Sequence, residues 1–333
     1  MYQRSAGGKI MVPLERKAQL VRGSYTPKFS KTISWKYTHL AAGAVCQDME
    51  LNHGRKMSTK LVQSIGAAVC ELAMDNEFEM SYELPEFEEV VSHIAISRDG
   101  TTTRIRDEGY RETMCGTISL YNSKGDRLHT IYSACAPEYG KKTFEEVLDM
   151  EIERIKATFS RVTYLGLADG SKDNWTYLQK HTTVDILDFF HATEYLADVC
   201  VVVKPSEIQQ KEWLMNACHD LKHKAKGARF ILRELKALQQ TLNDQVPEAL
   251  SKTITYFENN VQRMNYAQYQ KYGYPIGSGV TEAACKVVVK QRLNQSGMKW
   301  NMPAVQNMLL LRGIVCTKGR WVQFWKQYDK IAA

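Results

Sequence analysis

Three acidic residues lie where carboxylates could act together on a phosphodiester bond. Asp99 follows the apolar run HisIleAlaIle, Asp169 follows ValThrTyrLeuGlyLeuAla, and each is followed by glycine. Glu282 lies in a segment with the pattern of a helix start, IleGlySerGlyValThrGluAlaAlaCysLys. Carboxylates suit Mg²⁺ and Mn²⁺, and a pair of such ions can activate an attacking hydroxyl and stabilise the leaving oxygen. The three acids therefore suggest a two-metal phosphoryl-transfer site with Asp99, Asp169 and Glu282 as its catalytic metal ligands.

Each acid also has an ordinary structural interpretation. An Asp-Gly pair after an apolar strand is typical of a turn, which applies to Asp99 and to Asp169. A carboxylate in the first turn of a helix, as at Glu282, is favoured by the helix dipole. Asp107 and Asp126 compete with Asp99 for its role, although neither ends an apolar strand. The combination of the three acids carries the interpretation, more than any one of them.

The elements that must position these acids follow an ordered pattern. Alternating and apolar runs predict strands, an amphipathic run predicts a helix, and AsnSerLysGlyAsp predicts a hairpin turn. The expected order is strands 90–97, 113–121 and 128–133, helix 143–159, and strands 162–167 and 184–189. This is the order of an α/β, ribonuclease-H-like mixed sheet flanked by helices. In that fold the first and fourth strands are neighbours, so Asp99 and Asp169 would meet.

Composition shifts divide the chain into five regions. We expect a flexible basic arm at 1–30, a helical DNA-binding region at 31–84, the first part of the catalytic core at 85–204, an all-helical insertion at 205–273, and the second part of the core with C-terminal helices at 274–333. Within the second region, one helix begins near Ser34 and another follows an AsnHisGlyArg break, with Ser58 as a candidate N-cap. This pair fits a helix-turn-helix or an ordinary helical hairpin.

Composition limits the classes of protein considered. Lys and Arg total 44 against 37 Asp and Glu, a formal charge of +7, which suits a nucleic-acid partner but is also common for solubility. The eight cysteines include no Cys-x-x-Cys pair, so we expect no zinc site. No apolar run approaches the length of a membrane span. We expect a cytoplasmic protein without a membrane partner.

Several motifs together resemble those of bacterial Kra-type insertion-sequence transposases, a group of DDE enzymes. They are LeuAlaAspGlySerLysAspAsnTrp at 167–175, AspIleLeuAspPhePheHisAlaThrGluTyrLeu at 185–196, the segment around Glu282, SerGlyMetLysTrp at 296–300 and GlyArgTrpValGlnPheTrp at 319–325. The resemblance implies a ribonuclease-H-like domain with a helical insertion before the final glutamate, and Asp99, Asp169 and Glu282 as the triad. The family's cysteine-rich N-terminal segment is lacking here, which suggests a truncated or decayed copy.

The resemblance also implies an Asp-x-x-His motif, Asp188 to His191. His191 would contact DNA phosphates or, with Asp188, support the active site; a buried histidine satisfied by a neighbour is the alternative. Lys286, Lys290 and Arg292 follow Glu282 and could neutralise DNA phosphates, or form a solvated helix face. Val287 and Val288 are expected to face the core. Four tryptophans could stack on a flipped base, although core packing is the better expectation: Trp175, Trp300, Trp321 and Trp325.

Two functions follow. The first is a DDE transposase with two Mg²⁺ or Mn²⁺ ions, acting on transposon ends and target DNA as a homodimer or larger assembly, nucleoid-associated when on DNA. The alternative is a catalytically idle or truncated transposase-derived DNA-binding protein. A ribonuclease-H-like nuclease without strand transfer would use the same site.

Overall fold

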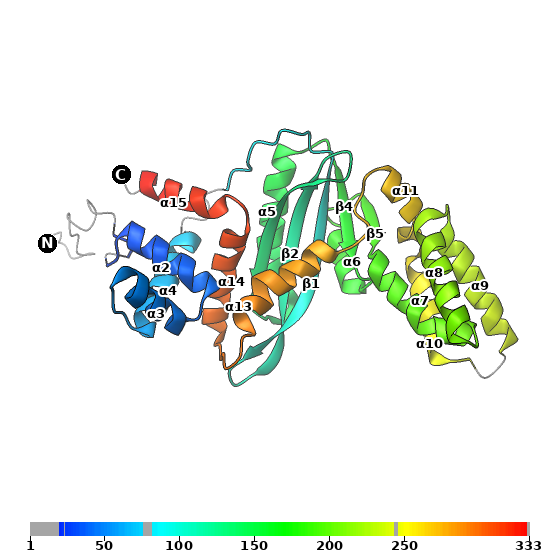
Figure 1. The fold of residues 1–333 in the computed structure, drawn as a ribbon. Coiled ribbons are helices and arrows are strands. Elements are labelled where there is room, and N and C mark those ends of the chain that lie inside the picture. Colours follow the sequence, from blue (N-terminus) through cyan, green and yellow to red (C-terminus); the bar gives the residue numbers. More distant parts are fainter. Residues whose placement is uncertain (1–19, 23, 76–81, 243–245, 332–333) are drawn as a thin grey trace.

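The computed structural model describes residues 20–22, 24–75, 82–242 and 246–331. Three parts lie side by side: N-terminal helices, a central sheet with its covering helices, and a helical arm (Figure 1). The fold is α/β, with a five-stranded mixed sheet flanked by helices. Among the described residues, no helix is both long and apolar enough to cross a membrane.

The N-terminal part holds three helices, α2 (Pro27–His39), α3 (Ala42–His53) and α4 (Thr59–Asp75). The predicted single helix beginning near Ser34 is wrong, because Leu40 is extended and separates α2 from α3. Ser58 accepts a hydrogen bond from the Leu61 N–H at 3.2 Å, which confirms it as an N-cap. The predicted basic arm at 1–30 lies mainly outside the described residues. Its predicted end is too late, because helix α2 already begins at Pro27.

The sheet has the strand order β3-β2-β1-β4-β5. Its strands are β1 (His93–Ile105), β2 (Gly109–Tyr121), β3 (Arg127–Cys135), β4 (Thr163–Ala168) and β5 (Val184–Leu187). Strands β1, β2 and β3 pair antiparallel, whereas β4 is parallel to β1 and β5 is parallel to β4. This layout is compatible with a ribonuclease-H-like sheet, and it confirms that the first and fourth strands are neighbours.

Strand β1 continues well beyond its predicted end. Asp99 pairs with Cys115, and pairing with β2 continues to Ile105 opposite Gly109. The threonines at 101–103 favour extended structure, and buried Thr103 accepts a hydrogen bond from Thr113. The hairpin turn comes later, where Asp107 and Gly109 have φ values of 66° and 79°. The prediction that Asp99-Gly100 ends the strand is therefore wrong, and Asp99 lies inside it.

Helices cover both faces of the sheet. Helix α5 (Lys142–Thr158) follows a 3₁₀ turn at Tyr139–Lys141 and packs on β2 and β3, while α6 (Lys172–Leu178) packs on β1 and β4. The amphipathic pattern predicted for α5 is confirmed, since Phe144, Leu148, Ile152 and Ile155 are buried. The C-terminal helices lie on the opposite face of the sheet or beside it. They are α12 (Gly279–Ala284), a π-helical segment (Cys285–Lys290), α13 (Gln291–Leu293), α14 (Met302–Cys316) and α15 (Arg320–Ile331).

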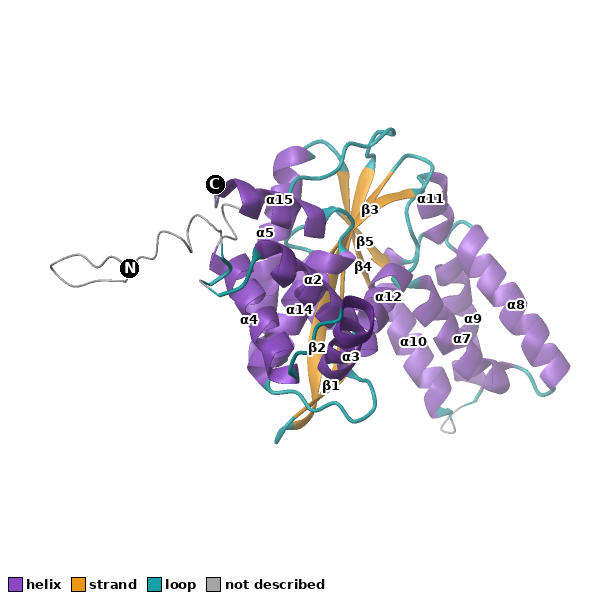
Figure 2. Cartoon of the chain, turned by 60° about the vertical axis from the view of Figure 1, so that its left-hand side comes forward, coloured by secondary structure: helices purple, strands orange, loops and turns teal. Residues whose placement is uncertain are grey.

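The helical arm lies across the sheet from the N-terminal helices (Figure 2). It comprises α8 (Glu207–His223), α9 (Gly227–Thr241), α10 (Glu248–Asn260), a 3₁₀ turn (Val261–Arg263) and α11 (Tyr266–Lys271). Helix α7 (Phe189–Val203) leads out of the sheet and packs on both α8 and α10. The arm therefore begins structurally at Phe189, earlier than the predicted boundary at 205.

The chain returns from the arm through a tight contact with the β2–β3 turn. Gly125 and Gly273 have φ values of 89° and 70°. A Cβ on Gly125 would lie 2.8 Å from the Gly273 carbonyl oxygen, and a Cβ on Gly273 would lie 2.7 Å from the Ser123 carbonyl oxygen. Only glycine suits both positions. This approach fixes where the segment leading to Glu282 re-enters the sheet domain.

Candidate active site

Asp99 lies in β1 on the face covered by α12 and the π-helical segment. Its Oδ1 accepts a hydrogen bond from the Gly100 N–H at 2.7 Å, and its Oδ2 lies 3.7 Å from the Cys285 thiol, which donates to it. Burial raises the pKa of the Asp99 carboxyl, and the negative charges of Asp169 and Glu282 raise it further. Removing a carboxylate from water disfavours its charged form, so Asp99 would gain from a nearby cation.

Asp169 follows β4 directly, as predicted, and Gly170 after it has a φ of 103°. The Asp169 Oδ1 accepts hydrogen bonds from the Ser171 N–H at 3.0 Å and from the Asn174 side-chain amide at 3.1 Å. Its carbonyl oxygen accepts one from the Tyr256 hydroxyl of the arm at 2.8 Å. Asp169 therefore closes a turn, and one oxygen of its carboxylate has a fixed position.

A buried arginine fixes the amide that holds Asp169. Arg98 donates through Nε to the Asn174 side-chain oxygen at 3.0 Å, so the amide nitrogen of Asn174 must face Asp169. The Arg98 guanidinium also donates to Glu145 at 2.6 Å and to the Asp173 carbonyl oxygen at 2.7 Å, and it lies over Tyr177. Its side chain is fully buried. Arg98 and Asn174 are thus positioning residues for Asp169.

Glu282 lies in the first turn of α12, which packs on β1 and β2. The buried Thr281 beside it shares a 2.6 Å hydrogen bond with Thr117 of β2. The Ser278 hydroxyl lies 3.2 Å from the Glu282 Oε1 but only 2.5 Å from the Asp188 Oδ2. One hydroxyl has one proton, and the shorter contact takes it. The Glu282 carboxylate is therefore held only weakly by the protein.

The three acids come from elements that pack against one another, yet their carboxylates do not form a preformed metal-binding site. The charges of Asp169 and Glu282 both act on Asp99. Across the described ranges, however, no three His, Cys, Asp or Glu side chains lie close enough together to hold a metal ion. Three carboxylates without a cation repel one another. Asp99 and Asp169 each accept local hydrogen bonds, whereas Glu282 is held only weakly. The metal site stays a prediction.

Asp188 and His191 have different surroundings. Asp188 is completely buried and accepts hydrogen bonds from the His191 N–H at 2.9 Å and from the Ser278 N–H and hydroxyl. It caps α7 and links that helix to the start of α12. The His191 ring is about one-third exposed, and its Nδ1 lies 3.2 Å from Glu194. The buried-histidine alternative is thus wrong for His191, whereas its contact with DNA stays a prediction.

The cationic residues after Glu282 separate into two groups. Lys286 and Lys290 are exposed on the π-helical segment, and neither forms an ion pair with a described residue. Arg292 is only 1% exposed, donates to the Tyr37 carbonyl oxygen at 3.0 Å and lies over Trp300. The expectation that Arg292 lies on a DNA-contacting surface is therefore wrong. It ties α13 to the N-terminal helices instead.

The inward-facing side chains of this segment repeat with helical spacing. Cys285, Val288 and Val289 are buried, which confirms the expectation for Val288. Val287 is 40% exposed, because at about 100° per residue it lies on the opposite side of the helix from Cys285, and the expectation that it faces the core is wrong. The Cys285 thiol faces Asp99, and the segment from Cys285 to Lys290 is π-helical. Nothing in the hydrophobic pattern of the sequence signals the π-turn.

Sequence reasoning missed Arg98, Asn174, Ser278 and Cys285. A charged residue inside the otherwise apolar run of β1 is the signal that could have found Arg98, since a buried arginine needs partners. The four tryptophans considered for base stacking are all at most 8% exposed, which confirms core packing: Trp175, Trp300, Trp321 and Trp325.

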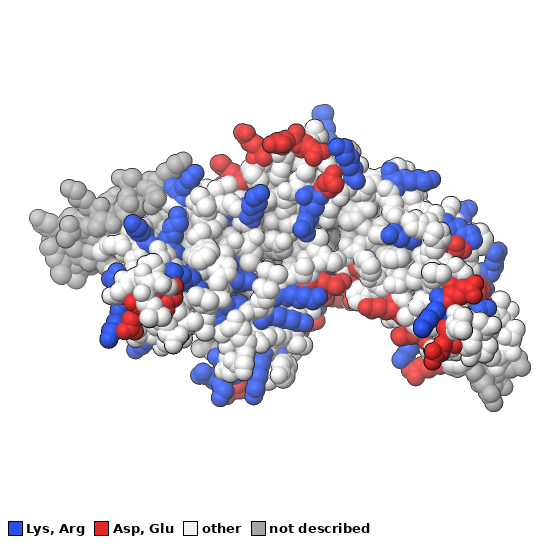
Figure 3. Space-filling view, in the orientation of Figure 1, with Lys and Arg blue, Asp and Glu red and all other residues white. Residues whose placement is uncertain are grey.

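Charge is unevenly distributed around the site. Lys and Arg side chains gather over the lower part of the central body, and acidic side chains lie in the hollow where that body meets the helical arm (Figure 3).

No protein-family model matches this sequence, and a search of curated proteins finds no significant similarity.

Proposed function

We propose that this protein is a DDE transposase that cleaves and joins DNA strands, of the Kra-type group that its motifs resemble. One observation carries the proposal: Asp99 lies in β1, Asp169 directly follows the adjacent parallel strand β4, and α12, which bears Glu282, packs on β1. The charges of Asp169 and Glu282 both act on Asp99. A strand order compatible with a ribonuclease-H-like sheet supports the same function.

Asp99, Asp169 and Glu282 would hold Mg²⁺ or Mn²⁺ in this proposal. Their oxygen donors match the preference of these hard cations. The pKa of Asp99 is raised mainly by burial and further by the charges of Asp169 and Glu282, and a bound cation would oppose these effects. When bound, such ions lower the pKa of an attacking hydroxyl and stabilise the leaving oxygen. The weakly held Glu282 carboxylate is free to turn toward the two aspartates.

The protein's other residues position the acids and the DNA. Asn174 holds Asp169, while Ser278 and Thr281 fix the start of the helix that bears Glu282. The exposed Lys286 and Lys290 bind backbone phosphates beside Glu282. The helical arm braces an element end, and a homodimer or larger assembly brings two ends together.

The reaction has two displacements at phosphorus. In the first, water attacks the phosphodiester at the element end, the bond from phosphorus to the 3′ oxygen breaks, and that oxygen takes a proton. In the second, the freed 3′-hydroxyl attacks a phosphodiester of target DNA and loses its proton. A new strand junction forms while one target strand is released with its own 3′-hydroxyl.

A cleavage assay tests this function. The substrates are DNA segments from both flanks of the coding sequence, incubated with Mg²⁺ or Mn²⁺, and a supercoiled plasmid is added to detect joining. Asp169→Asn should abolish cleavage, and Asp198→Asn, which changes an exposed carboxylate on α7, should leave it intact. Equal cleavage by the two variants would exclude Asp169 from the site. Cleavage without joining would identify a ribonuclease-H-like nuclease.

A second function is favoured by one observation. The described part of the chain holds no preassembled group of three metal-ligating side chains, as would suit a catalytically idle, transposase-derived DNA-binding protein. Such a protein would bind DNA in EDTA as well as in Mg²⁺, with strong salt dependence, and would cut neither strand. Thermal stabilisation by Mg²⁺ that disappears in Asp169→Asn would argue against it.

A further inference from the structure

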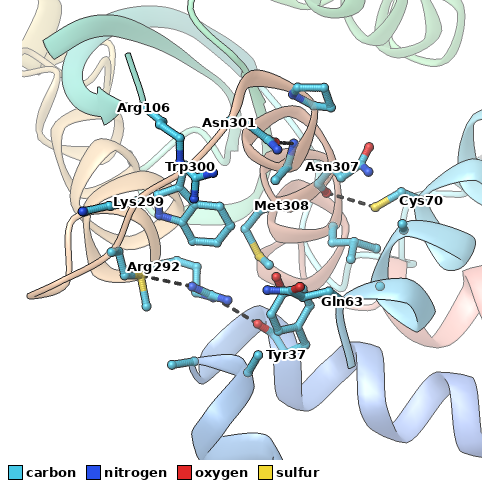
Figure 4. A pocket seen from close by; sticks show the side chains of 18 residues that line it. Tyr37, Gln63, Cys70, Arg106, Arg292, Lys299, Trp300, Asn301, Asn307 and Met308 are labelled. Atoms are coloured by element: carbon cyan, nitrogen blue, oxygen red, sulfur yellow. Dashed lines mark hydrogen bonds between the residues drawn. The ribbon is translucent and has the colours of Figure 1, made fainter. Parts of the chain in front are cut away.

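A cavity of about 540 Å³ lies between the N-terminal helices and the sheet domain (Figure 4). Helices α2 and α4 form one wall, and α14 with residues 298–301 forms the other. Arg106, just beyond the end of β1, closes one side. None of the three candidate catalytic acids lines this cavity, so it is separate from the site described above.

The cavity is cationic. Arg106, Arg292 and Lys299 line it, and its lining contains no aspartate or glutamate. Arg106 and Lys299 are exposed, and within the described ranges neither forms an ion pair. Their two segments are held together, because the Arg106 N–H donates to the Trp300 carbonyl oxygen at 2.7 Å. Two unneutralised cations therefore lie at one side of a concave surface, an arrangement that favours an anion.

Arg292 adds a fixed charge to the wall. Its guanidinium lies between Tyr37 and Trp300, with its carbon 5.0 Å and 4.8 Å from the two ring centroids. Burial lowers the pKa of Arg292 to about 10, so the side chain stays protonated at neutral pH. Because it is 1% exposed, Arg292 contributes positive potential rather than direct contact.

The remaining lining suits a planar, polar group. Gln63, Asn301 and Asn307 present side-chain amides. Asn301 uses its oxygen to cap α14. Amides can donate to and accept from the edges of nucleobases. Met308 and Leu311 give the cavity an apolar part. Its volume is within the range of small-ligand sites and exceeds what a phosphate group alone would need.

We propose that this cavity binds one nucleotide unit of a DNA strand, with its phosphate at Arg106 and Lys299 and its base against the amides. The inference rests on the proposed function only in taking DNA as the source of the nucleotide. Arg106 lies seven residues along the chain from Asp99, so the bound nucleotide would lie about 24 Å from the cleaved bond. That distance corresponds to roughly seven nucleotides of duplex DNA.

Binding is tested in EDTA, so that the result does not depend on catalysis. Fluorescence anisotropy with labelled flank DNA compares the wild type, an Arg106→Glu/Lys299→Glu variant and Ala67→Phe, which fills the cavity without changing charge. Arg161→Glu is the control, because Arg161 is exposed and precedes β4, at the opposite end of the sheet from Asp99. We expect both cavity variants to bind at least tenfold more weakly and the control to bind normally.

A cross-linking experiment on the wild type covers the case in which Ala67→Phe fails to fold. DNA carrying 5-iodouracil at single positions is irradiated, and the linked peptide is identified by mass spectrometry. We expect cross-links to residues 37–70 or 298–311 from one narrow window of positions. Cross-links only to other residues would overturn the proposal that the cavity binds DNA. The same follows if Ala67→Phe binds DNA with wild-type affinity while the charge variant loses affinity, because the two cations would then contact phosphates at the surface only.

The source of the nucleotide is tested with thymidine monophosphate as a competitor. We expect thymidine monophosphate to displace the DNA only at millimolar concentrations. Tight binding of the free nucleotide that leaves DNA binding unchanged would overturn the proposal. Failure of the cavity proposal can be distinguished from failure of the proposed function. Cavity-dependent DNA binding without cleavage would refute only the transposase, and cleavage with unaffected binding in the cavity variants would refute only the cavity.

Discussion

Asp188 accepts hydrogen bonds from both the backbone N–H and the hydroxyl of Ser278, a residue 90 positions later in the chain. The same carboxylate accepts the His191 N–H and thereby caps α7. One fully buried side chain thus connects the end of β5, the first helix of the arm and the start of the helix that bears Glu282. The helical arm and the candidate active site are joined at this point.

Replacing Asp188 by Asn should destabilise the protein. An amide can turn its oxygen toward only one side, so its NH₂ group would face an N–H or a hydroxyl that now donates to the carboxylate. A buried donor left unpaired costs about 1–3 kcal/mol. We expect Asp188→Asn to lower the free energy of unfolding by about 2 kcal/mol in urea titrations. Asp198→Asn, an exposed change on the same helix, should have no effect, and equal stability of the two variants would contradict this role.

Asn174→Ala should impair catalysis more than folding. The change removes the amide that orients Asp169 and leaves Arg98 with its other partners. Loss of a group that orients a metal ligand typically lowers metal affinity or activity by about 10–100-fold. The measurement is DNA cleavage as a function of Mg²⁺ concentration, with Thr176→Ala on the exposed side of the same helix as control. A purely structural role would lower the unfolding temperature and leave the Mg²⁺ dependence unchanged.

Thr117 and Thr281 should be energetically coupled. Their hydroxyls share a buried hydrogen bond of 2.6 Å between β2 and α12. Thr117→Val or Thr281→Val leaves one hydroxyl unpaired, at a cost of about 1–3 kcal/mol, whereas the double change removes both polar groups. We expect the double variant to be destabilised by less than the sum of the single variants. Additive losses in a double-mutant cycle would show that the two hydroxyls act independently.

His129 should make the protein sensitive to mild acid. Burial, with a smaller effect from the charge of Lys318, lowers the pKa of His129 to about 4. An unfolded histidine titrates near 6.5, so between about pH 6.5 and pH 4 the unfolded chain takes up a proton that the folded protein does not. Stability from this group is present above pH 6.5 and is lost as the pH falls, by about 2 kcal/mol at pH 5.

The variant His129→Gln checks this assignment. Glutamine can still bond the Tyr82 hydroxyl, which lies 2.8 Å from the His129 ring, but it does not titrate. The drop in unfolding free energy between pH 7 and pH 5 should therefore be about 2 kcal/mol smaller in the variant than in the wild type. His219→Gln on the exposed side of α8 serves as the control. Identical pH profiles for the wild type and His129→Gln would refute the prediction.

Much of the fold follows from local patterns in the sequence. The alternation in β2 and β3, the apolar runs of β4 and β5 and the amphipathic pattern of α5 predict elements close to those observed. These signals are local, because side-chain direction repeats every two residues in a strand and about every 3.6 in a helix. The order of the elements also predicts that β1 and β4 are neighbours, which brings Asp99 and Asp169 to adjacent strands.

The tertiary structure decided what depends on partners far along the chain. The Asp-Gly pair at 99 signals a turn, yet pairing with β2 continues the strand to Ile105. The basic stretch after Glu282 predicts Arg292 as a DNA contact, yet packing between α2 and α13 buries it. Asn174 orients Asp169 only because Arg98, 76 residues earlier, fixes its amide. Such contacts depend on which side chains meet in space, and the local periodicity of the sequence does not contain that information.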